Sequence, residues 1–311
     1  MYILLAIALV AADATPAVLA RGETRVIAIE GDGTWDMTVL RGPEDGNPYG
    51  QPRGLALSND GVLYVSDTFG DRILAFGPDG EPSEIIAWEG LDTPTELWSV
   101  GTDTLVVTAI QAGRGRDLQW WAARADGTWA ARPLLEAFPA LRGAAGDKPL
   151  TPVLRKGAWR FMRQDPNSRE VTLIEPETGE TERLPSKYWD DEDRFWAIGP
   201  DRMVEVLNAA GDLIGRFPAE VGMPSRMWGR VYFPVQPVRG REPAPTAVAD
   251  LICFSPDGTV SRRIDVQLDR TRLRVMSPDG KRLVWVRSGF SGNPGVADGR
   301  YRIEVAEGLL R

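Results

Sequence analysis

The chain has 311 residues, of which 43% are hydrophobic and 26% charged, so it contains enough apolar material for a folded core. It contains no histidine, which excludes Ser–His–Asp and Cys–His catalysis and also His-ligated zinc and haem. The net charge is −8 and no basic stripe is present, so we expect no nucleic-acid partner.

Residues 1–20 contain an unbroken apolar run at positions 3–12. Ala12-Asp13-Ala14 fits the small-x-small pattern of a signal-peptide cleavage site, and the run is too short to span a bilayer comfortably. No Lys or Arg precedes the run, however, and a buried β-strand is the alternative interpretation. We expect a periplasmic or secreted protein if residues 1–20 are a signal peptide, and a cytoplasmic one if they are a strand. No other segment is apolar enough to predict a membrane span.

The next predicted element is a hairpin over residues 24–41. Its turn is Glu30-Gly31-Asp32-Gly33, which separates the apolar run RVIAI from TWDMTVL.

Residues 51–90 follow with four short strands separated by turn residues. Asp60-Gly61 and Asp79-Gly80 supply the positive φ that tight hairpins need. The predicted strands are residues 55–57, 62–66, 72–76 and 83–88. Four short antiparallel strands in about 40 residues are typical of one propeller blade.

The same alternation of strand and turn recurs along the whole chain. The later turns are residues 124–127, 175–179, 208–211, 255–258 and 277–280. The repeats divide the chain into blades at residues 51–90, 92–139, 148–187, 188–220, 224–268 and 269–311. The prediction is a single all-β domain over residues 21–311, a β-propeller with six blades, or seven if residues 1–20 are a strand. Pairing of the N-terminal strands with the last blade would close the ring and protect its edge strands.

The first blade resembles the NHL repeat. The matching segments are residues 52–56 (PRGLA), 61–67 (GVLYVSD), 71–73 (DRI) and 76–80 (FGPDG). The later, more divergent blades look like bacterial six-bladed propellers of the NHL and TolB-like kind. This resemblance implies the fold and does not imply a reaction, because propellers host many unrelated functions.

Arginine recurs where the channel mouth is expected. In a propeller, the loop before each innermost strand and the loop joining the second and third strands open on one face, around the central channel. The predicted positions before the innermost strands are Arg53, Glu96, Arg194, Arg226 and Arg272. The predicted upper loops add Arg114, Arg116, Arg163, Arg239 and Arg241. Because the guanidinium group suits carboxylates and phosphates, we predict an anionic ligand or an acidic peptide at this mouth.

The alternative is that these arginines form ion pairs within the protein, with Asp67, Asp92 and Asp193 as partners. In NHL-like repeats, the Asp at the position of Asp67 or Asp71 usually accepts hydrogen bonds from its own turn and from a nearby Arg. We keep Asp67 as a candidate ligand-binding residue beside this structural interpretation. The acidic run at residues 190–193 carries enough oxygen ligands for Ca²⁺, but its spacing fits no EF-hand loop, so we predict a solvated turn.

The single cysteine, Cys253, lies in an apolar run and is predicted to be a buried strand residue. Eleven tryptophans are many for this length. Stacking against a sugar or peptide is one use for them, and packing between sheets is the other. The candidate tryptophans for either role are Trp120, Trp121, Trp129, Trp189, Trp196 and Trp228.

Two functions are consistent with these observations. The first is a monomeric, non-catalytic scaffold that binds a protein, peptide or glycan through the arginine-lined mouth and needs no cofactor. The second is a lactonase or hydrolase similar to the gluconolactonase-like propellers, which hold a divalent cation such as Ca²⁺ in the channel with Glu, Asn and Asp. Glu96 is the candidate Glu, and Asn47, Asn167 and Asn293 lie in predicted loops. No clear metal-binding triad is present. The resemblance identifies no catalytic residue.

Overall fold

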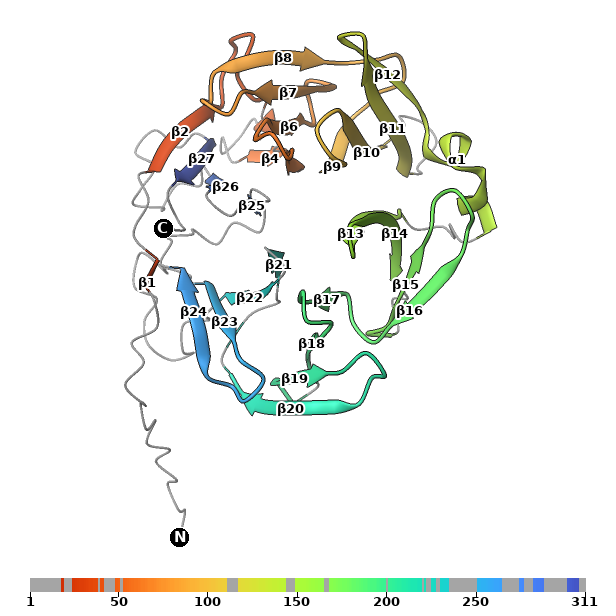
Figure 1. Ribbon diagram of the computed structural model, residues 1–311. Helices are drawn as coiled ribbons and strands as arrows, with labels where there is room; N and C mark the ends of the chain where they lie inside the picture. Colours follow the sequence, from red (N-terminus) through yellow and green to blue (C-terminus); the bar gives the residue numbers. More distant parts are fainter. Residues whose placement is uncertain are drawn as a thin grey trace.

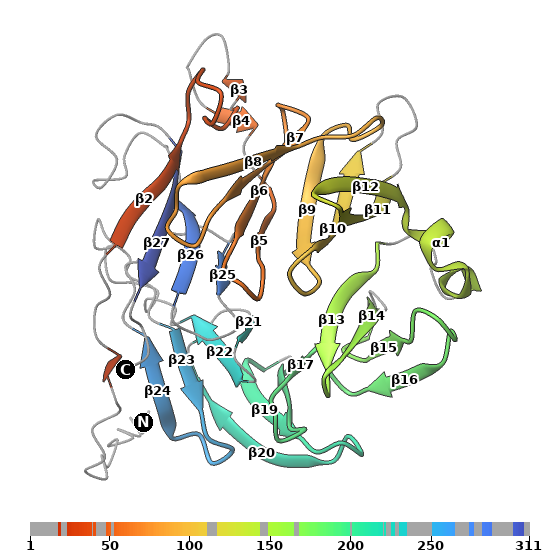
Figure 2. The same cartoon turned by 45° about the horizontal axis from the view of Figure 1, so that its top comes forward.

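The computed structural model describes residues 18–19, 24–38, 40–41, 48–50, 53–110, 117–143, 149–164, 168–199, 201–219, 221, 225–227, 230–234, 251–264, 274–276, 282–287 and 301–307. Six sheets of at least four strands surround a central axis, so the protein is a six-bladed β-propeller, as predicted (Figure 1). The strands of each sheet follow one another from the centre of the ring to its rim (Figure 2).

Each of the first four sheets is built from four strands that are consecutive in the chain. From the innermost strand outward, the first two sheets are β5 (Leu55–Leu57), β6 (Leu63–Asp67), β7 (Arg72–Phe76) and β8 (Pro82–Ile86), then β9 (Pro94–Ser99), β10 (Thr104–Ile110), β11 (Asp117–Ala125) and β12 (Thr128–Pro133). The third and fourth are β13 (Thr151–Arg155), β14 (Ala158–Gln164), β15 (Val171–Ile174) and β16 (Thr181–Leu184), then β17 (Tyr188–Trp189), β18 (Phe195–Ile198), β19 (Met203–Leu207) and β20 (Leu213–Pro218).

The last two sheets each take in a strand from the N-terminal region. The fifth is β21 (Ser225–Met227), β22 (Arg230–Pro234), β23 (Leu251–Phe254) and β24 (Val260–Ile264), and β1 (Val18–Leu19) pairs in parallel with β24. The sixth is β25 (Arg274–Met276), β26 (Arg282–Arg287), β27 (Arg302–Glu307) and β2 (Thr24–Ile29). Because β2 pairs with β27, the N-terminal strand closes the ring as predicted.

The predicted hairpin over residues 24–41 is wrong. After β2 the chain runs to the first sheet, and Met37 is buried in the core cluster shared by the first and sixth sheets. The next strand, β3 (Leu40–Arg41), pairs with β4 (Pro48–Gly50) in a separate two-stranded sheet. The segment has turn residues and apolar residues, but burial against another blade outweighs local pairing.

Residues 1–17 lie outside the described residues, so the signal peptide stays a prediction. The part of this segment that the structure describes, Val18–Leu19, adds to the fifth sheet, and the described residues form no seventh blade.

The core lies between neighbouring blades, because each sheet buries both faces. Strand β6 is buried at all five positions, as expected for a strand between two other sheets. Between the first and second sheets, for example, Tyr64 and Ile73 pack in one cluster with Leu97 and Val107. The helical elements α1 (Leu134–Ala137) and η1 (Pro139–Gly143, a 3₁₀ helix) cover the second and third sheets through Leu134 and Leu141.

The turn residues act as the sequence predicted. Asp126 and Gly127 both have positive φ, 52° and 79°, as the two central residues of a tight hairpin between β11 and β12. No helix among the described residues has the length and apolar character needed to cross a membrane.

Gly54, in the NHL-like segment, is required by close packing between the first two blades. A Cβ at this position would lie 2.9 Å from Leu97 Cβ and 3.0 Å from Leu97 N. We expect Gly54→Ala to lower the free energy of unfolding by about 1–3 kcal/mol, measured by urea denaturation. Gly143→Ala is the control, because a Cβ there meets no atom within 4 Å. Equal denaturation midpoints for the two variants would contradict the packing argument.

Candidate functional site at the channel mouth

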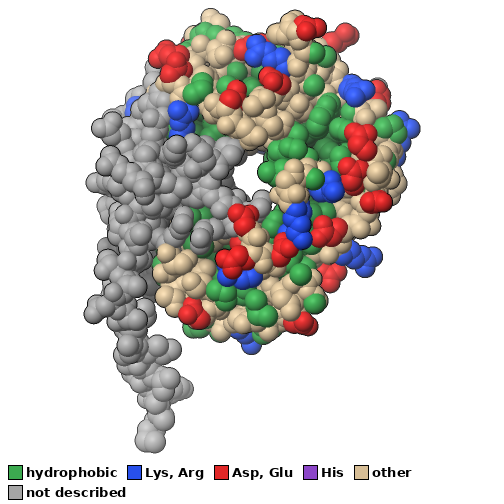
Figure 3. Space-filling view, in the orientation of Figure 1, with side chains coloured by type: hydrophobic (Ala, Val, Ile, Leu, Met, Phe, Trp, Pro, Cys, Tyr) green, Lys and Arg blue, Asp and Glu red, His purple; other side chains and the backbone are tan. Residues whose placement is uncertain are grey.

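The sheet topology defines two faces of the ring. Because neighbouring strands in each blade are antiparallel, the loop before the innermost strand and the loop joining the second and third strands lie on one face. We call it the mouth face. The hairpins joining the first to the second strand and the third to the fourth lie on the opposite face. Figure 3 shows an opening at the centre of the ring.

Arg53 and Glu96 belong to adjacent blades and lie toward the mouth face. Arg53 lies two residues before the start of β5, Glu96 is the third residue of β9, and both are exposed. Their chain neighbours Gly54 and Leu97 are buried and in direct contact, so the two strands approach closely here. The topology therefore places both residues toward the same face of the ring, one in each of two adjacent blades.

Asp67 is fully buried, and both of its carboxylate oxygens accept hydrogen bonds. Thr38 donates its backbone N–H to Oδ1 at 2.8 Å and its hydroxyl to Oδ2 at 3.2 Å. Arg72 Nε donates to Oδ2 at 2.8 Å, and Arg72 also donates to the carbonyl oxygen of Asp36. The structure thus gives Asp67 the role of attaching residues 36–38 to the first blade.

Two residues with left-handed backbone meet at the mouth between the first and second blades. Asp71 has φ 51° and Thr93 has φ 44°, and Asp71 Oδ1 accepts the Thr93 N–H at 2.7 Å. Positive φ is unusual for a β-branched residue, and such strain persists only where the surroundings impose it. This contact fixes the backbone three residues before Glu96.

The predicted position of Arg194, before the innermost strand of the fourth blade, is wrong. Its innermost strand is β17, so residues 190–194 connect the first and second strands and lie on the opposite face. The residue before β17 on the mouth face is Lys187. Sequence reasoning missed this lysine because a two-residue strand has no periodicity to detect.

Lys187 is half-buried and has no described carboxylate partner. Its Nζ donates to Oε1 of Gln164, the last residue of β14, at 3.0 Å and lies 5.2 Å from the centroid of the Tyr188 ring. Burial lowers the pKa of Lys187, and burial raises the pKa of Tyr188. The phenol therefore stays neutral and adds no negative charge beside the amine.

The other predicted mouth residues are only partly described. Arg226 lies in β21 and pairs through its backbone with Val231, and Arg163 lies in β14. Outside the described residues lie Arg272, Arg114, Arg116, Arg239 and Arg241.

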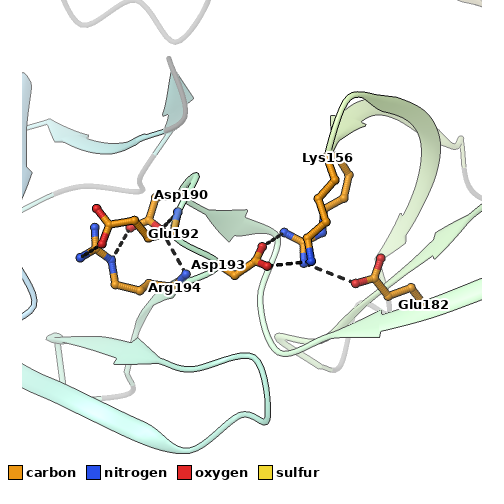
Figure 4. A network of polar contacts seen from close by, with 7 residues as sticks. Lys156, Glu182, Asp190, Glu192, Asp193 and Arg194 are labelled. Atoms are coloured by element: carbon orange, nitrogen blue, oxygen red, sulfur yellow. Dashed lines mark hydrogen bonds and ion pairs between the residues drawn. The ribbon is translucent and has the colours of Figure 1, made fainter.

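The opposite face carries a charged network between the third and fourth blades (Figure 4). The Arg155 side chain is 5% exposed and contacts Asp193 at 2.5 Å and Glu182 at 3.3 Å. Its guanidinium carbon also lies 5.5 Å from the ring centroids of Trp189 and Phe195. Lys156 reaches the other oxygen of Asp193 at 2.7 Å. In Figure 3, charged side chains gather beside the opening where these two sheets meet.

The prediction that residues 190–193 form a solvated turn is wrong for Asp190, which is 3% exposed. Its Oδ1 accepts the backbone N–H groups of Glu192 and Arg194, and its Oδ2 accepts from Arg194 Nε and Trp196 Nε1. The carboxylate therefore organises the turn. A charged run in the sequence does not reveal which of its members is buried.

The described residues contain no group of three or more His, Cys, Asp and Glu side chains positioned to hold a metal ion. The three candidate asparagines, Asn47, Asn167 and Asn293, lie outside the described residues.

The candidate tryptophans that the structure describes lie in or against the core clusters between sheets. Trp189 and Trp196 are buried, Trp120 makes an edge-to-face contact with Trp88, and Trp121 makes one with Phe138. Trp129 donates its indole N–H to Glu84. Trp228 lies outside the described residues. Cys253 is 3% exposed in β23, so its predicted placement as a buried strand residue is confirmed.

Similarity to known proteins is limited to distantly related solved structures. No family model and no curated protein matches the chain. Among solved structures, the PQQ-bound aldose sugar dehydrogenase of Streptomyces coelicolor is similar at 13% identity and TM-score 0.48, over 93% of this chain and 99% of that one. Virginiamycin B lyase from Staphylococcus aureus is similar at 11% identity and TM-score 0.42, over 82% and 94%. A protein of unknown function from Bacteroides caccae is similar at 12% identity and TM-score 0.40, over 80% and 95%. These neighbours include enzymes and a protein of unknown function, and they carry no argument about activity.

Proposed function

We propose that the protein is a β-propeller scaffold that binds an anionic partner, an acidic peptide segment of a protein or a carboxylated glycan, at the mouth face. If residues 1–20 are a signal peptide, the partner is met in the periplasm or outside the cell. The proposal requires only shape and charge, and the exposed Arg53 on the mouth face supports it.

The observation that carries the proposal is the exposure of the Arg53 side chain. It is exposed and forms no ion pair with a residue that the structure describes. The alternative predicted from the sequence was an internal pair with Asp67, Asp92 or Asp193, and Arg53 forms an ion pair with none of these described residues. Asp67 is bound to Arg72 and Thr38, and Asp193 is bound to Arg155 and Lys156 on the opposite face. An exposed guanidinium group without an internal carboxylate suits a carboxylate or phosphate of a ligand.

Binding of acidic probes tests this proposal. We expect labelled hexaglutamate or a galacturonic acid oligomer to bind the purified chain at low salt, measured by fluorescence anisotropy, and hexaglutamine and maltohexaose not to bind. Arg53→Glu should weaken binding at least tenfold, because it replaces attraction by repulsion.

Arg183→Glu is the matched control, since Arg183 is an exposed residue of the outer strand β16 and the change in net charge is the same. An equal loss of affinity in the two variants would show that net charge alone drives binding. Absence of binding of both acidic probes to the unaltered chain would also contradict the proposal.

Binding of a divalent metal ion distinguishes the hydrolase alternative from the scaffold. A divalent cation held by Glu96 and partners from other blades would raise the melting temperature by mass action, and EDTA would reverse the shift. A large, EDTA-sensitive shift with Ca²⁺, abolished by Glu96→Gln, would favour the hydrolase over the scaffold.

A further inference from the structure

Five Asp-Gly dipeptides lie among the residues that the structure describes, and one of them differs from the other four in its hydrogen bonds. At such a dipeptide the glycine nitrogen can attack the carboxyl carbon of the aspartate side chain, because glycine has no Cβ to hinder the approach. In a folded chain the attack is slowed wherever the nitrogen or the carboxyl group is already held by another contact. The five are Asp32-Gly33, Asp60-Gly61, Asp79-Gly80, Asp126-Gly127 and Asp257-Gly258.

The glycine N–H is held by a hydrogen bond in four of the five dipeptides. Gly33 donates to Asp36 Oδ2 at 2.8 Å, and the carbonyl oxygens of Ser58, Gly77 and Ser255 accept from Gly61 at 3.1 Å, Gly80 at 2.8 Å and Gly258 at 2.9 Å. The Gly127 N–H has no hydrogen bond with a described residue. The reason is the turn, in which Ala125 pairs with Thr128 and leaves the two central residues outside the ladder. The nitrogen of Gly127 is therefore the one that no contact holds.

The Asp126 carboxylate is not held either. Three of the other four carboxylates accept a hydrogen bond at their own turn, Asp60 from Ser58 Oγ at 2.5 Å, Asp79 from the Glu81 N–H at 3.1 Å and Asp257 from the Thr259 N–H at 3.0 Å. Asp126 has no hydrogen bond or ion pair with a described residue, and both Asp126 and Gly127 are exposed. Both reacting groups of this dipeptide are thus free to meet, and water reaches them.

We propose that Asp126-Gly127 is a modification site, at which the folded chain isomerises its own backbone to an isoaspartyl linkage. The Gly127 nitrogen attacks Cγ of Asp126, and the amide proton and the carboxyl hydroxyl leave together as water. Water then adds to the main-chain carbonyl carbon of the five-membered succinimide ring. The bond from that carbon to nitrogen breaks, and the chain continues through Cγ. One water molecule is lost and one is taken up, so the mass is unchanged and no oxidant or reductant is needed.

The modification would act on the contact between the first two blades. An isoaspartyl linkage adds one atom to the main chain of the turn, which sets the pairing of Arg124 with Trp129. Trp129 donates its indole N–H to Glu84 of the first blade at 3.0 Å. We therefore expect the modified chain to lose amide-exchange protection in β12.

This proposal does not depend on the proposed function. The turn joins the third and fourth strands of its blade, so it lies on the face opposite Arg53. Failure of acidic probes to bind would leave the isomerisation unaffected, and absence of isomerisation would leave the binding of acidic probes unaffected.

The test is incubation of the folded full chain near neutral pH, followed by trypsin digestion. Isoaspartyl methyltransferase with a labelled methyl donor then marks the free α-carboxylate of each isoaspartyl peptide. We expect the peptide of residues 125–142 to gain label roughly tenfold faster than the peptides that carry the other four dipeptides, because there one or two hydrogen bonds must break first. Equal labelling of the five, or faster labelling of another, would overturn the proposal.

The same incubation in urea separates the effect of the fold from that of the sequence. Denaturation removes the contacts that hold the other four dipeptides, so all five should then gain label at similar rates. If the preference for Asp126 were as large in urea as in the folded chain, the hydrogen bonds of the fold would not select the site, and the proposal would be wrong.

Asp126→Glu is the variant that removes the site and keeps the charge. A glutamate would have to close a six-membered ring, which forms far more slowly, so most of the label on the five peptides of the folded chain should disappear. Asp60→Glu is the matched control, since Asp60 is also an exposed turn residue followed by glycine, and it should leave the label nearly unchanged. An equal loss of label in the two variants would show that Asp126 is not the favoured site.

Discussion

Arg155→Ala is expected to lower the free energy of unfolding by about 1–3 kcal/mol, because it removes a buried side chain that packs and pairs between two blades. Arg155 is 5% exposed on its side chain and joins two blades, through Asp193 of the fourth and Glu182 of the third. Its loss also removes the guanidinium group from the faces of Trp189 and Phe195. The measurement is equilibrium denaturation in urea.

Arg216→Ala is the control for this variant. Arg216 pairs with Asp201, and both side chains are nearly half exposed. We expect a change of about 0–1 kcal/mol, as for exposed ion pairs in general. If Arg155→Ala were no more destabilising than Arg216→Ala, the network between the third and fourth blades would not stabilise the ring.

The contribution of this network should also depend on pH. The hydrogen bond from Lys156, followed by the charge of Arg155, lowers the pKa of Asp193 below its ordinary value of 3.8. Because the pKa is lower in the folded than in the unfolded protein, the stabilisation is fully present above the unfolded pKa and is lost as pH falls through the folded one. The difference in stability between the unaltered chain and Asp193→Asn should therefore be constant near neutral pH and shrink below about pH 4.

Asp67→Ala is expected to cost about 2–4 kcal/mol of unfolding free energy and to release the segment that connects the closing strand to the first blade. The change removes the acceptor of the Thr38 N–H and the partner of Arg72, whose side chain is 22% exposed. Urea denaturation gives the energy, and amide hydrogen exchange at residues 36–38 reports the local release.

Asp257→Ala provides the comparison for Asp67. Asp257 accepts a backbone N–H from Thr259 within an exposed turn, so its removal should change the denaturation midpoint far less. If the two variants behave alike, or if exchange at residues 36–38 is unchanged in Asp67→Ala, Asp67 does not hold the segment. Acidic-peptide binding measured on the same variant shows whether Asp67 also affects the mouth.

The sequence predicted the blades because each blade is a local structure. Turn residues such as Asp60-Gly61 and Asp126-Gly127 separate strands that pair with their immediate neighbours, so the repeating pattern is readable within about 40 residues. The closing strand was predicted as well, because an all-β ring leaves exposed edges unless its ends pair. Arg53 and Glu96 were placed on the mouth face by the same topology.

Contacts between blades are what the tertiary structure alone decided. Asp67 meets Thr38 across 29 positions and Arg155 meets Asp193 across 38, and nothing in the local pattern of either segment names its partner. Lys187 was missed, and Arg194 was placed on the wrong face, because β17 is two residues long and the strand pattern begins only at Phe195. The amino-acid sequence by itself determined the fold, since hairpin turns and strand alternation act over short distances. Which charged groups pair within the protein and which stay exposed was decided only when the ring brought neighbouring blades together, because burial and pairing of side chains depend on packing between distant segments.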